Sequence, residues 1–422
     1  MKNISIVGGG PAGLGVAFYS KKNNLTYELY EANKIFGGNC ITYKYNDFYF
    51  DSGAHRLHDK DNETTELFKN LLSEDLQLIN IPSQIYRDGR FIDFPISPLN
   101  LIKFFGLKQC ITEAIKIVFN KKNKEYNFKS LVERKYGKKI SKLFLLDYSE
   151  KLWGEKAENL STNIAGKRLK GLNIYTFILE FFFGNKKKTK HLDGSFLYPK
   201  YGIGTLFEHL SNQLDQGNIY KDAAITKIYH HKNIITEIEI NGMQIKKVNN
   251  LVSSMPLNKM LKILDPAPAK EILKIAEKII FRNVILVIFL LNKNNINKNG
   301  SMYFPSKKYP FTRVYEPKNR STFMSPKNNT SLAVEIPCFN NDEYWNMEDE
   351  EIKKSISKHL IEIGLFDVDE VIDSVVKKIF HAYPVLSLNY EENIKQINKY
   401  LSNFKNLHLT GRNGLFTYSH IH

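Results

Sequence analysis

The chain of 422 residues contains little cysteine and has no long apolar run. Its three cysteines, Cys40, Cys110 and Cys338, lie far apart, form no C-x-x-C pair and have no pair of histidines nearby. This pattern predicts free thiols in a reducing compartment and no metal site. The longest apolar segments, Val284–Leu291 and Tyr175–Phe183, are far shorter than the ~20 residues of a membrane-spanning helix. No signal peptide precedes the first strand, so we expect a cytoplasmic protein.

Acidic residues are outnumbered by basic ones: 44 Asp and Glu stand against 60 Lys and Arg, which gives a net charge of +16 at neutral pH. The lysine-rich stretch 186–190 belongs to this excess. A solvated surface is the simplest explanation. Attraction of an anionic substrate, or peripheral contact of the lysines and Tyr175–Phe183 with an anionic membrane face, remains open. No basic-aromatic motif accompanies the charge, so we expect no nucleic-acid partner.

A glycine-rich turn lies between the first predicted strand, Ile4–Val7, and a predicted helix. The turn, residues 8–13, has the pattern G-x-G-x-x-G. In such a turn Gly8 permits the tight bend, Gly10 lets the backbone approach a pyrophosphate, and Gly13 lets the helix pack close to the strand. The pattern therefore predicts a dinucleotide site.

The residues after this turn complete the nucleotide-binding unit. Pro11 and Ala12 suit the first turn of a helix whose positive end points at the phosphates. A second strand, residues 26–30, ends at Glu31, where a carboxylate takes the ribose hydroxyls. Strand, turn, helix, strand and acid thus follow in the order that dinucleotide binding requires.

Two further segments favour FAD over NAD. Gly37 and Gly38 follow Glu31 closely, and the segment 50–55 ends at His55 after another apolar stretch. They resemble the second phosphate-contacting turn and the flavin-facing segment of the flavoprotein group that includes amine oxidases, protoporphyrinogen oxidases and UDP-galactopyranose mutases. That group often has Arg after the double glycine, whereas this chain has Asn39 at that cofactor-binding position. A second G-x-G-x-x-G does not occur, so a separate NAD domain is not expected.

The order of the remaining segments predicts an α/β fold with three parts. A Rossmann-type FAD-binding domain of the glutathione-reductase-2-like kind is assembled from residues 1–85, 191–258 and 381–422. Residues 86–190 form a helical substrate or lid domain, in which 86–91 predict a hairpin with an Asp-Gly turn at Asp88 and Gly89 and about 98–188 show helical periodicity. Residues 259–380 carry strand-like segments and form an antiparallel-sheet substrate domain.

Within the wider group, the chain resembles the UDP-galactopyranose mutases at several spaced points. The segment 53–58 matches that family's G-x-H-x-x-H motif beside the flavin and contains His55. Phe144, Tyr148 and Trp153 reproduce its aromatic spacing, in which Phe and Tyr hold the uracil ring and Trp lies on the lid near the sugar. On their own, Phe144 and Tyr148 could equally form an apolar core stripe, since they lie at i and i+4.

The carboxy-terminal half continues the resemblance. Arg313 falls on the strand whose arginine binds the diphosphate, and Glu335 and Tyr383 fall where the family has residues near the substrate. Gly411 and Arg412 match its last flavin motif. Read without the family, Arg313 could be a surface ion-pair partner and His55 a structural histidine.

The chain departs from the family in two places. The family has a second lid arginine a few residues beyond the position of Arg168. Here only Lys170 could replace it, and a lysine lacks the bidentate fork of arginine. The family's last motif also continues into acidic residues and a helix, where this sequence stops at His422. These differences leave the identity of the sugar open.

The resemblance implies a flavin-dependent sugar-nucleotide mutase, which exchanges pyranose and furanose forms through N5 of reduced flavin in cell-surface polysaccharide biosynthesis. It implies catalytic roles for His55, Arg313 and Trp153, a nucleotide-sugar substrate, and NAD(P)H as a diffusible reductant. A flavin oxidase or dehydrogenase acting on an amine, a porphyrinogen or a sugar is the alternative. A binding or assembly protein that keeps FAD for structure is the third reading, and a homodimer is left open.

Overall fold

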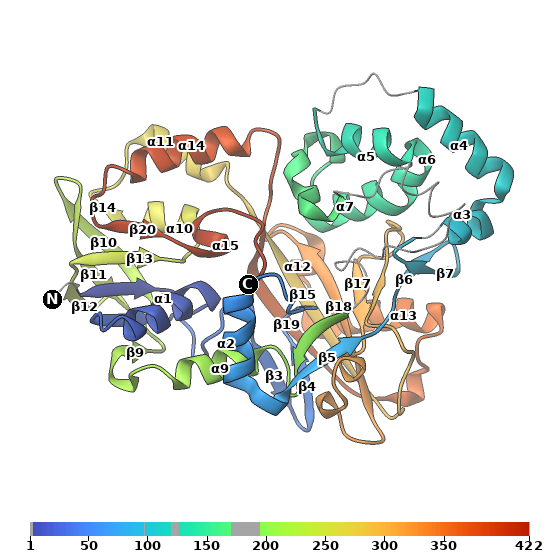
Figure 1. Ribbon diagram of the computed structural model, residues 1–422, viewed down its shortest axis with the longest axis horizontal. Helices are drawn as coiled ribbons and strands as arrows, with labels where there is room; N and C mark the ends of the chain where they lie inside the picture. Colours follow the sequence, from blue (N-terminus) through green and yellow to red (C-terminus); the bar gives the residue numbers. More distant parts are fainter. Residues whose placement is uncertain (1–2, 97, 120–125, 170–194, 422) are drawn as a thin grey trace.

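A computed structural model describes residues 3–96, 98–119, 126–169 and 195–421 (Figure 1). A parallel sheet with its helices lies at the left of Figure 1, a helical part at the upper right, and a long mixed sheet below it. The carboxy terminus lies near the centre, close to the junction of the parts. The candidate active site lies at this junction, because each of the three parts contributes residues to it.

The nucleotide-binding part is built on a parallel sheet in the order β20-β13-β1-β2-β9. Its strands are β1 (Ile4–Val7), β2 (Tyr27–Tyr30), β9 (Ile219–Tyr220), β13 (Asn250–Ser253) and β20 (Leu407–Leu409). Helices α1 (Pro11–Lys22) and α9 (Gly204–Asn212) belong to the same part. The pairing joins segments from three separate stretches of sequence, so the predicted α/β Rossmann-type fold is confirmed.

Smaller elements surround this sheet. A four-stranded sheet contains β10 (Ile225–His231), β11 (Ile234–Ile240), β12 (Gln244–Lys247) and β14 (Leu264–Asp265). Helices α10 (Leu257–Lys262), α11 (Lys270–Glu277) and α14 (Tyr390–Leu401) share an apolar core with it. The other short elements are β3 (Thr42–Tyr45), β4 (Phe48–Asp51), α2 (Asn62–Leu72), β5 (Leu76–Asn80), β8 (Ser195–Pro199) and α15 (Gly411–Gly414).

The substrate part is a seven-stranded sheet in the order β19-β15-β18-β17-β16-β6-β7. Two of its strands, β15 (Phe281–Leu291) and β18 (Thr330–Cys338), are buried along their whole length, which explains the unbroken apolar run Val284–Leu291 of β15. The other strands are β6 (Ser83–Arg87), β7 (Arg90–Phe94), β16 (Ser301–Tyr303), β17 (Arg313–Tyr315) and β19 (Val371–Pro384), and the helices are α12 (Glu343–Asn346) and α13 (Asp349–Ile363).

The edges of this sheet fall outside the expected range 259–380. The predicted hairpin around Asp88 and Gly89 is confirmed as β6–β7, and both turn residues have positive φ (49° and 76°). This hairpin pairs with β16 and so belongs to the sheet, although the expected boundary at 86 cuts through it. At the other edge, β19 runs past residue 381.

The helical part contains α3 (Pro98–Phe105), α4 (Leu107–Phe119), α5 (Phe128–Tyr136), α6 (Lys138–Ile140) and α7 (Asp147–Trp153). Helix α5 begins at a capping box on Asn127 and ends at Gly137. A π-helical segment, Ser141–Leu146, runs directly into α7. No helix in the described ranges is long and apolar enough to cross a membrane.

Candidate active site

The predicted glycine turn joins the carboxyl end of β1, the central strand of the parallel sheet, to the amino end of α1. Gly8 has a φ of +97°, and a Cβ added at Gly13 would overlap the carbonyl oxygen of Gly8. At Gly10, by contrast, a Cβ would meet nothing nearer than Gly38 Cα at 3.7 Å. Gly8 and Gly13 are therefore required by the backbone of the turn, whereas Gly10 leaves open the space in which a pyrophosphate would lie.

Two distant glycine motifs lie against this turn. The N–H of Gly37 donates to the carbonyl of Gly9 (2.8 Å). Gly38 has a φ of +55° and lies close to the backbone of Gly10. Gly411, with a φ of +75°, is so close to the start of α1 that a Cβ there would lie 2.9 Å from the Cβ of Ala12. The three motifs, together with Pro11 and Ala12 in the first turn of α1, thus enclose one site.

The carboxylate of Glu31 is buried at the end of β2. It accepts the N–H of Gly9 (2.6 Å) on one oxygen, and the backbone N–H (2.9 Å) and side-chain amide (2.6 Å) of Asn33 on the other. A carboxylate has about four acceptor positions, so these three donors fix its orientation and leave room for a ribose hydroxyl. This arrangement fits the adenosine half of FAD.

Asn39 and Arg412 contact backbone carbonyls. Asn39 and Asn413 both donate through Nδ2 to the carbonyl of His381, each at 3.1 Å. The guanidinium of Arg412 donates to the carbonyls of Ala382 (3.3 Å) and Ser419 (3.2 Å from Nε). Both residues therefore hold β19 and the chain end against the glycine motifs.

His381 was missed by the sequence analysis, although its carbonyl joins Asn39 to Asn413. Its φ of +54° is unusual for a residue other than glycine, and no local motif signals such a conformation.

His55 lies in the loop that follows β4, and its ring is buried. Its Nε2 atom has no hydrogen-bond partner among the described residues. Burial, and to a smaller extent the charges of Arg412 and Arg313, lower the pKa of His55 to about 3, so the ring is neutral at physiological pH. An unpaired buried nitrogen beside the glycine motifs is what a site for a bound flavin would present.

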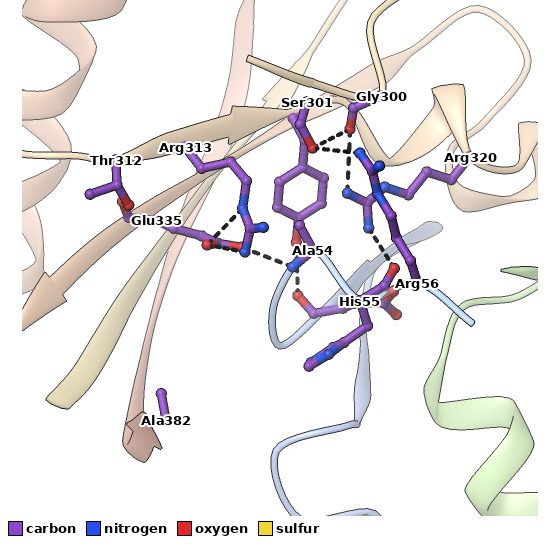
Figure 2. Close-up of polar contacts among 12 residues, drawn as sticks. Ala54, His55, Arg56, Gly300, Ser301, Thr312, Arg313, Arg320, Glu335 and Ala382 are labelled. Atoms are coloured by element: carbon purple, nitrogen blue, oxygen red, sulfur yellow. Dashed lines mark hydrogen bonds and ion pairs between the residues drawn. The ribbon is translucent and has the colours of Figure 1, made fainter. Parts of the chain in front are cut away.

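Arg313 and Glu335 form a partly buried ion pair across neighbouring strands: the side chain of Glu335 is 3% exposed and that of Arg313 is 18% exposed. They are register partners on β17 and β18, and Glu335 Oε2 accepts Arg313 Nε (2.9 Å) and Nη2 (2.5 Å). The other oxygen, Oε1, accepts the N–H of Ala54 at 2.8 Å. One carboxylate therefore fixes both the arginine expected at the substrate and the loop that carries His55 (Figure 2).

Arg320 is a second residue that the sequence analysis missed. Its side chain is 1% exposed and donates to the carbonyls of His55 (3.1 Å) and Gly300 (3.3 Å), as Figure 2 shows. The guanidinium also lies 4.4 Å from the ring centre of Tyr315. It thus supports the His55 loop from the side of the sheet. It lies in a loop of no recognisable pattern, so only the fold reveals it.

An aromatic cluster covers the same region. Trp153 is 3% exposed, and its ring centre lies 5.3 Å from that of Tyr418 and 6.0 Å from that of Tyr383. Tyr148 packs edge-on against Tyr303 at 5.9 Å. Burial raises the pKa of Tyr383 to about 12, so its hydroxyl stays protonated. Tyr148, Trp153, Tyr383, Glu335 and Arg313 are therefore brought together from α7 and the sheet.

Phe144 is placed differently from Tyr148. It is 4% exposed and packs edge-on against Phe104 and Phe105, at 5.6 and 6.2 Å between ring centres. It thus belongs to the core of the helical part, and only Tyr148 lies beside the site. Arg168 falls in the 3₁₀ segment Thr162–Leu169, where its side chain is outside the described residues, as is the whole of Lys170.

Known proteins of similar sequence or fold agree on the group. Coproporphyrinogen III oxidase of Bacillus subtilis (strain 168) is 20% identical over 470 residues, which covers 97% of this chain and 93% of that protein. Reduced UDP-galactopyranose mutase has a similar structure, with a TM-score of 0.85 and 17% identity over 98% of this chain and 90% of that one. An Exiguobacterium sp. 255-15 protein assigned as a protoporphyrinogen oxidase gives a TM-score of 0.78 and 16% identity over 98% and 94%.

These likenesses confirm the resemblance inferred from the motifs and the expected fold. At such identities the structural matches describe the fold and not the reaction. The family model of flavin-containing amine oxidoreductases matches residues 11–416, which is nearly the whole chain. The chain therefore belongs to the flavin-containing amine oxidoreductase family.

Proposed function

We propose that the protein is an FAD-dependent sugar-nucleotide mutase, which interconverts the pyranose and furanose forms of a nucleotide sugar for cell-surface polysaccharide synthesis. The observation that carries the proposal is the cluster of Arg313, Glu335, Tyr148 and Trp153 beside the loop of His55. The similarity to reduced UDP-galactopyranose mutase over 98% of the chain supports it.

In this proposal the bound, reduced flavin supplies the nucleophilic nitrogen, and the protein supplies orientation and charge. NAD(P)H is the proposed diffusible reductant. Neutral His55 does not act as a proton donor at physiological pH, because its pKa is about 3. Its role is to lie against the flavin in a loop that Glu335 and Arg320 hold in place.

Arg313 is the proposed partner of the leaving diphosphate. A guanidinium has five N–H donors, and Glu335 engages its Nε and Nη2 atoms, which leaves the donors on Nη1 for a phosphate oxygen. Arg168 and Lys170 are proposed to assist from the lid. Tyr148 is proposed to stack on the base, while Trp153 excludes water over the sugar.

A flavin oxidase is the second candidate. The sequence similarity to coproporphyrinogen III oxidase favours it, and so does the aromatic cluster of Trp153, Tyr383 and Tyr418, which gives the site an apolar wall. An oxidase needs oxidised flavin as hydride acceptor and is regenerated by oxygen. A mutase needs reduced flavin and consumes no electrons overall.

The test uses this difference in electron balance. Dithionite-reduced protein is incubated anaerobically with a panel of UDP-, TDP- and GDP-sugars, and the products are separated by chromatography. Oxidised protein is incubated in air with an amine, a porphyrinogen and the same sugars while hydrogen peroxide is measured. Many turnovers per reduction support the mutase. Peroxide formation from an amine or porphyrinogen, with no sugar isomer from any donor, rejects it in favour of the oxidase.

A further inference from the structure

Lys151 joins the helical part to the substrate sheet in an unusual way. Its ammonium donates to three backbone carbonyls of one segment: Phe304 (2.6 Å), Ser306 (2.8 Å) and Tyr309 (2.9 Å). All three donors of a lysine are thereby used, and all three acceptors are neutral. The segment 304–309 leads directly into the residues before β17, and Lys151 itself lies on α7.

The position of Lys151 on α7 matters for the site. Tyr148 lies one helical turn before it and Trp153 two residues after it, and both contact aromatic residues of the substrate region. On the other side, Phe304 N donates to Thr312 O, next to Arg313. The three bonds of Lys151 therefore join the helix that carries two of the proposed substrate residues to the strand that carries the third.

We propose that Lys151 is a positioning residue, which holds α7 at a fixed depth against the segment before Arg313 and so sets the width of the substrate site. The geometric part of this inference stands on the contacts alone, and its effect on turnover rests on the proposed function.

Neighbouring contacts make the same junction. Arg282 on β15 donates to the carbonyl of Lys151 (3.4 Å) and pairs with Asp342 (2.8 Å). At the end of α7, a Cβ added at Gly154 would overlap Phe339 and crowd Arg282. Lys151 thus lies at the centre of a close interface and not on a free surface.

The charges around Lys151 come from every element packed against it. Arg87 on β6 bonds Asp147 on α7 at 3.3 Å, and Lys307 bonds Glu150 at 2.7 Å. A cavity of about 350 Å³, lined in part by Lys151, Arg282 and Lys307, gives water access to this junction. Desolvation, with Arg87 close by, lowers the pKa of Lys151 to about 7, although Asp147 opposes the shift.

The experiment compares three flavin-loaded variants with the wild type by amide hydrogen exchange. Lys151→Met keeps most of the unbranched, apolar part of the side chain and leaves three carbonyls without their donor, so protection of α7 and of residues 304–309 should fall at least tenfold. Lys151→Arg should restore part of it. Lys307→Met is the matched control, because Lys307 joins the same segment to α7 through one exposed bond and should change protection little.

Substrate binding separates positioning from a general structural role. The dissociation constant of UDP from the reduced protein should increase about tenfold in Lys151→Met, with flavin content unchanged, and Lys151→Arg should recover part of the affinity.

Unchanged or increased protection in Lys151→Met overturns the inference, as does an equal loss in Lys307→Met. Absence of binding of UDP, TDP and GDP alike to the wild type rejects the proposed function instead, and the exchange measurements still decide the role of Lys151.

Discussion

The nucleotide-binding turn and the substrate side of the site are built in different ways. The turn is made of backbone: Gly8, Gly10 and Gly13 lie within six residues and need only the absence of side chains. The substrate side is made of side chains from distant segments, since Glu335 reaches both Arg313 on the next strand and the N–H of Ala54. A cofactor anchor can thus be coded locally, whereas the reactive site depends on the register of a long sheet.

The largest expected effect tests the nucleotide-binding turn, which is coded by a local segment of sequence. Gly10→Val should abolish flavin binding while the protein still folds, because a Cβ at Gly10 meets no atom nearer than 3.7 Å but occupies the approach of the pyrophosphate. Flavin absorbance and thermal unfolding of the purified protein measure both. The control is Gly15→Val on the same helix, where a Cβ meets nothing within 4 Å. A folded Gly10→Val protein with one flavin per chain would contradict the assignment.

The next largest effect tests the substrate side, whose side chains come from distant segments of the sequence. Glu335→Ala leaves the partly buried guanidinium of Arg313 without its partner and the N–H of Ala54 unpaired, so the free energy of unfolding should fall by about 3 kcal/mol, the lower end of the range for a buried pair. Urea denaturation of the flavin-loaded protein measures it. Lys308 and Glu362 form a comparable pair on the exposed surface, and Glu362→Ala should have no measurable effect. Equal stability of Glu335→Ala and Glu362→Ala would show that the pair of Arg313 and Glu335 has no structural role.

Within the helical part, Phe144 and Tyr148 should differ in what their substitution changes. Phe144→Ala should lower the free energy of unfolding by about 3–5 kcal/mol, because its ring is packed in the core against Phe104 and Phe105. Tyr148→Ala should instead weaken UDP binding by ~1–3 kcal/mol, the scale of base–aromatic stacking, with a smaller loss of stability. Denaturation and calorimetry with UDP separate the two. A weaker affinity for UDP in Phe144→Ala alone would assign the base contact to Phe144.

The difference between the two regions also explains what the sequence could predict. The glycine turns and Glu31 follow from local patterns of glycine, charge and apolar residues, and in the fold they lie together at the end of β1 and β2. The pairing of Arg313 with Glu335 depends on the register between β17 and β18, which no local pattern specifies.

Burial sets a second limit on prediction from sequence. Phe144 and Tyr148 lie four residues apart, and the sequence alone does not show which of them is a core residue. Only the packing of α3 against Phe144 identifies it as the core ring and Tyr148 as the ring beside the site. Arg320 and Lys151 show no pattern at all. Each becomes informative because a charged group is enclosed among backbone carbonyls, which is a property of the fold.

The smallest expected effect concerns the junction of the two regions, where His55 lies. Its pKa is about 3 in the folded protein and near ~6.5 in an unfolded chain. Above pH 6.5 the ring is neutral in both the folded and the unfolded state, so His55 adds no pH dependence to the stability. As pH falls below 6.5 the unfolded state takes up a proton that the folded state does not, so stability is lost by about 1.4 kcal/mol per pH unit. His55→Asn removes this dependence.

The measurement is therefore a difference between two pH profiles. Urea denaturation of wild type and His55→Asn at pH 7 and pH 5 should show that the wild type loses about 2 kcal/mol more than the variant over this interval. Other carboxylates and histidines titrate in both proteins and cancel in the comparison. Parallel profiles would mean that the ring takes up a proton as readily in the folded protein as in the unfolded chain, with a pKa near ~6.5 in both. The low pKa of His55, on which its role in the proposed mechanism rests, would then be wrong.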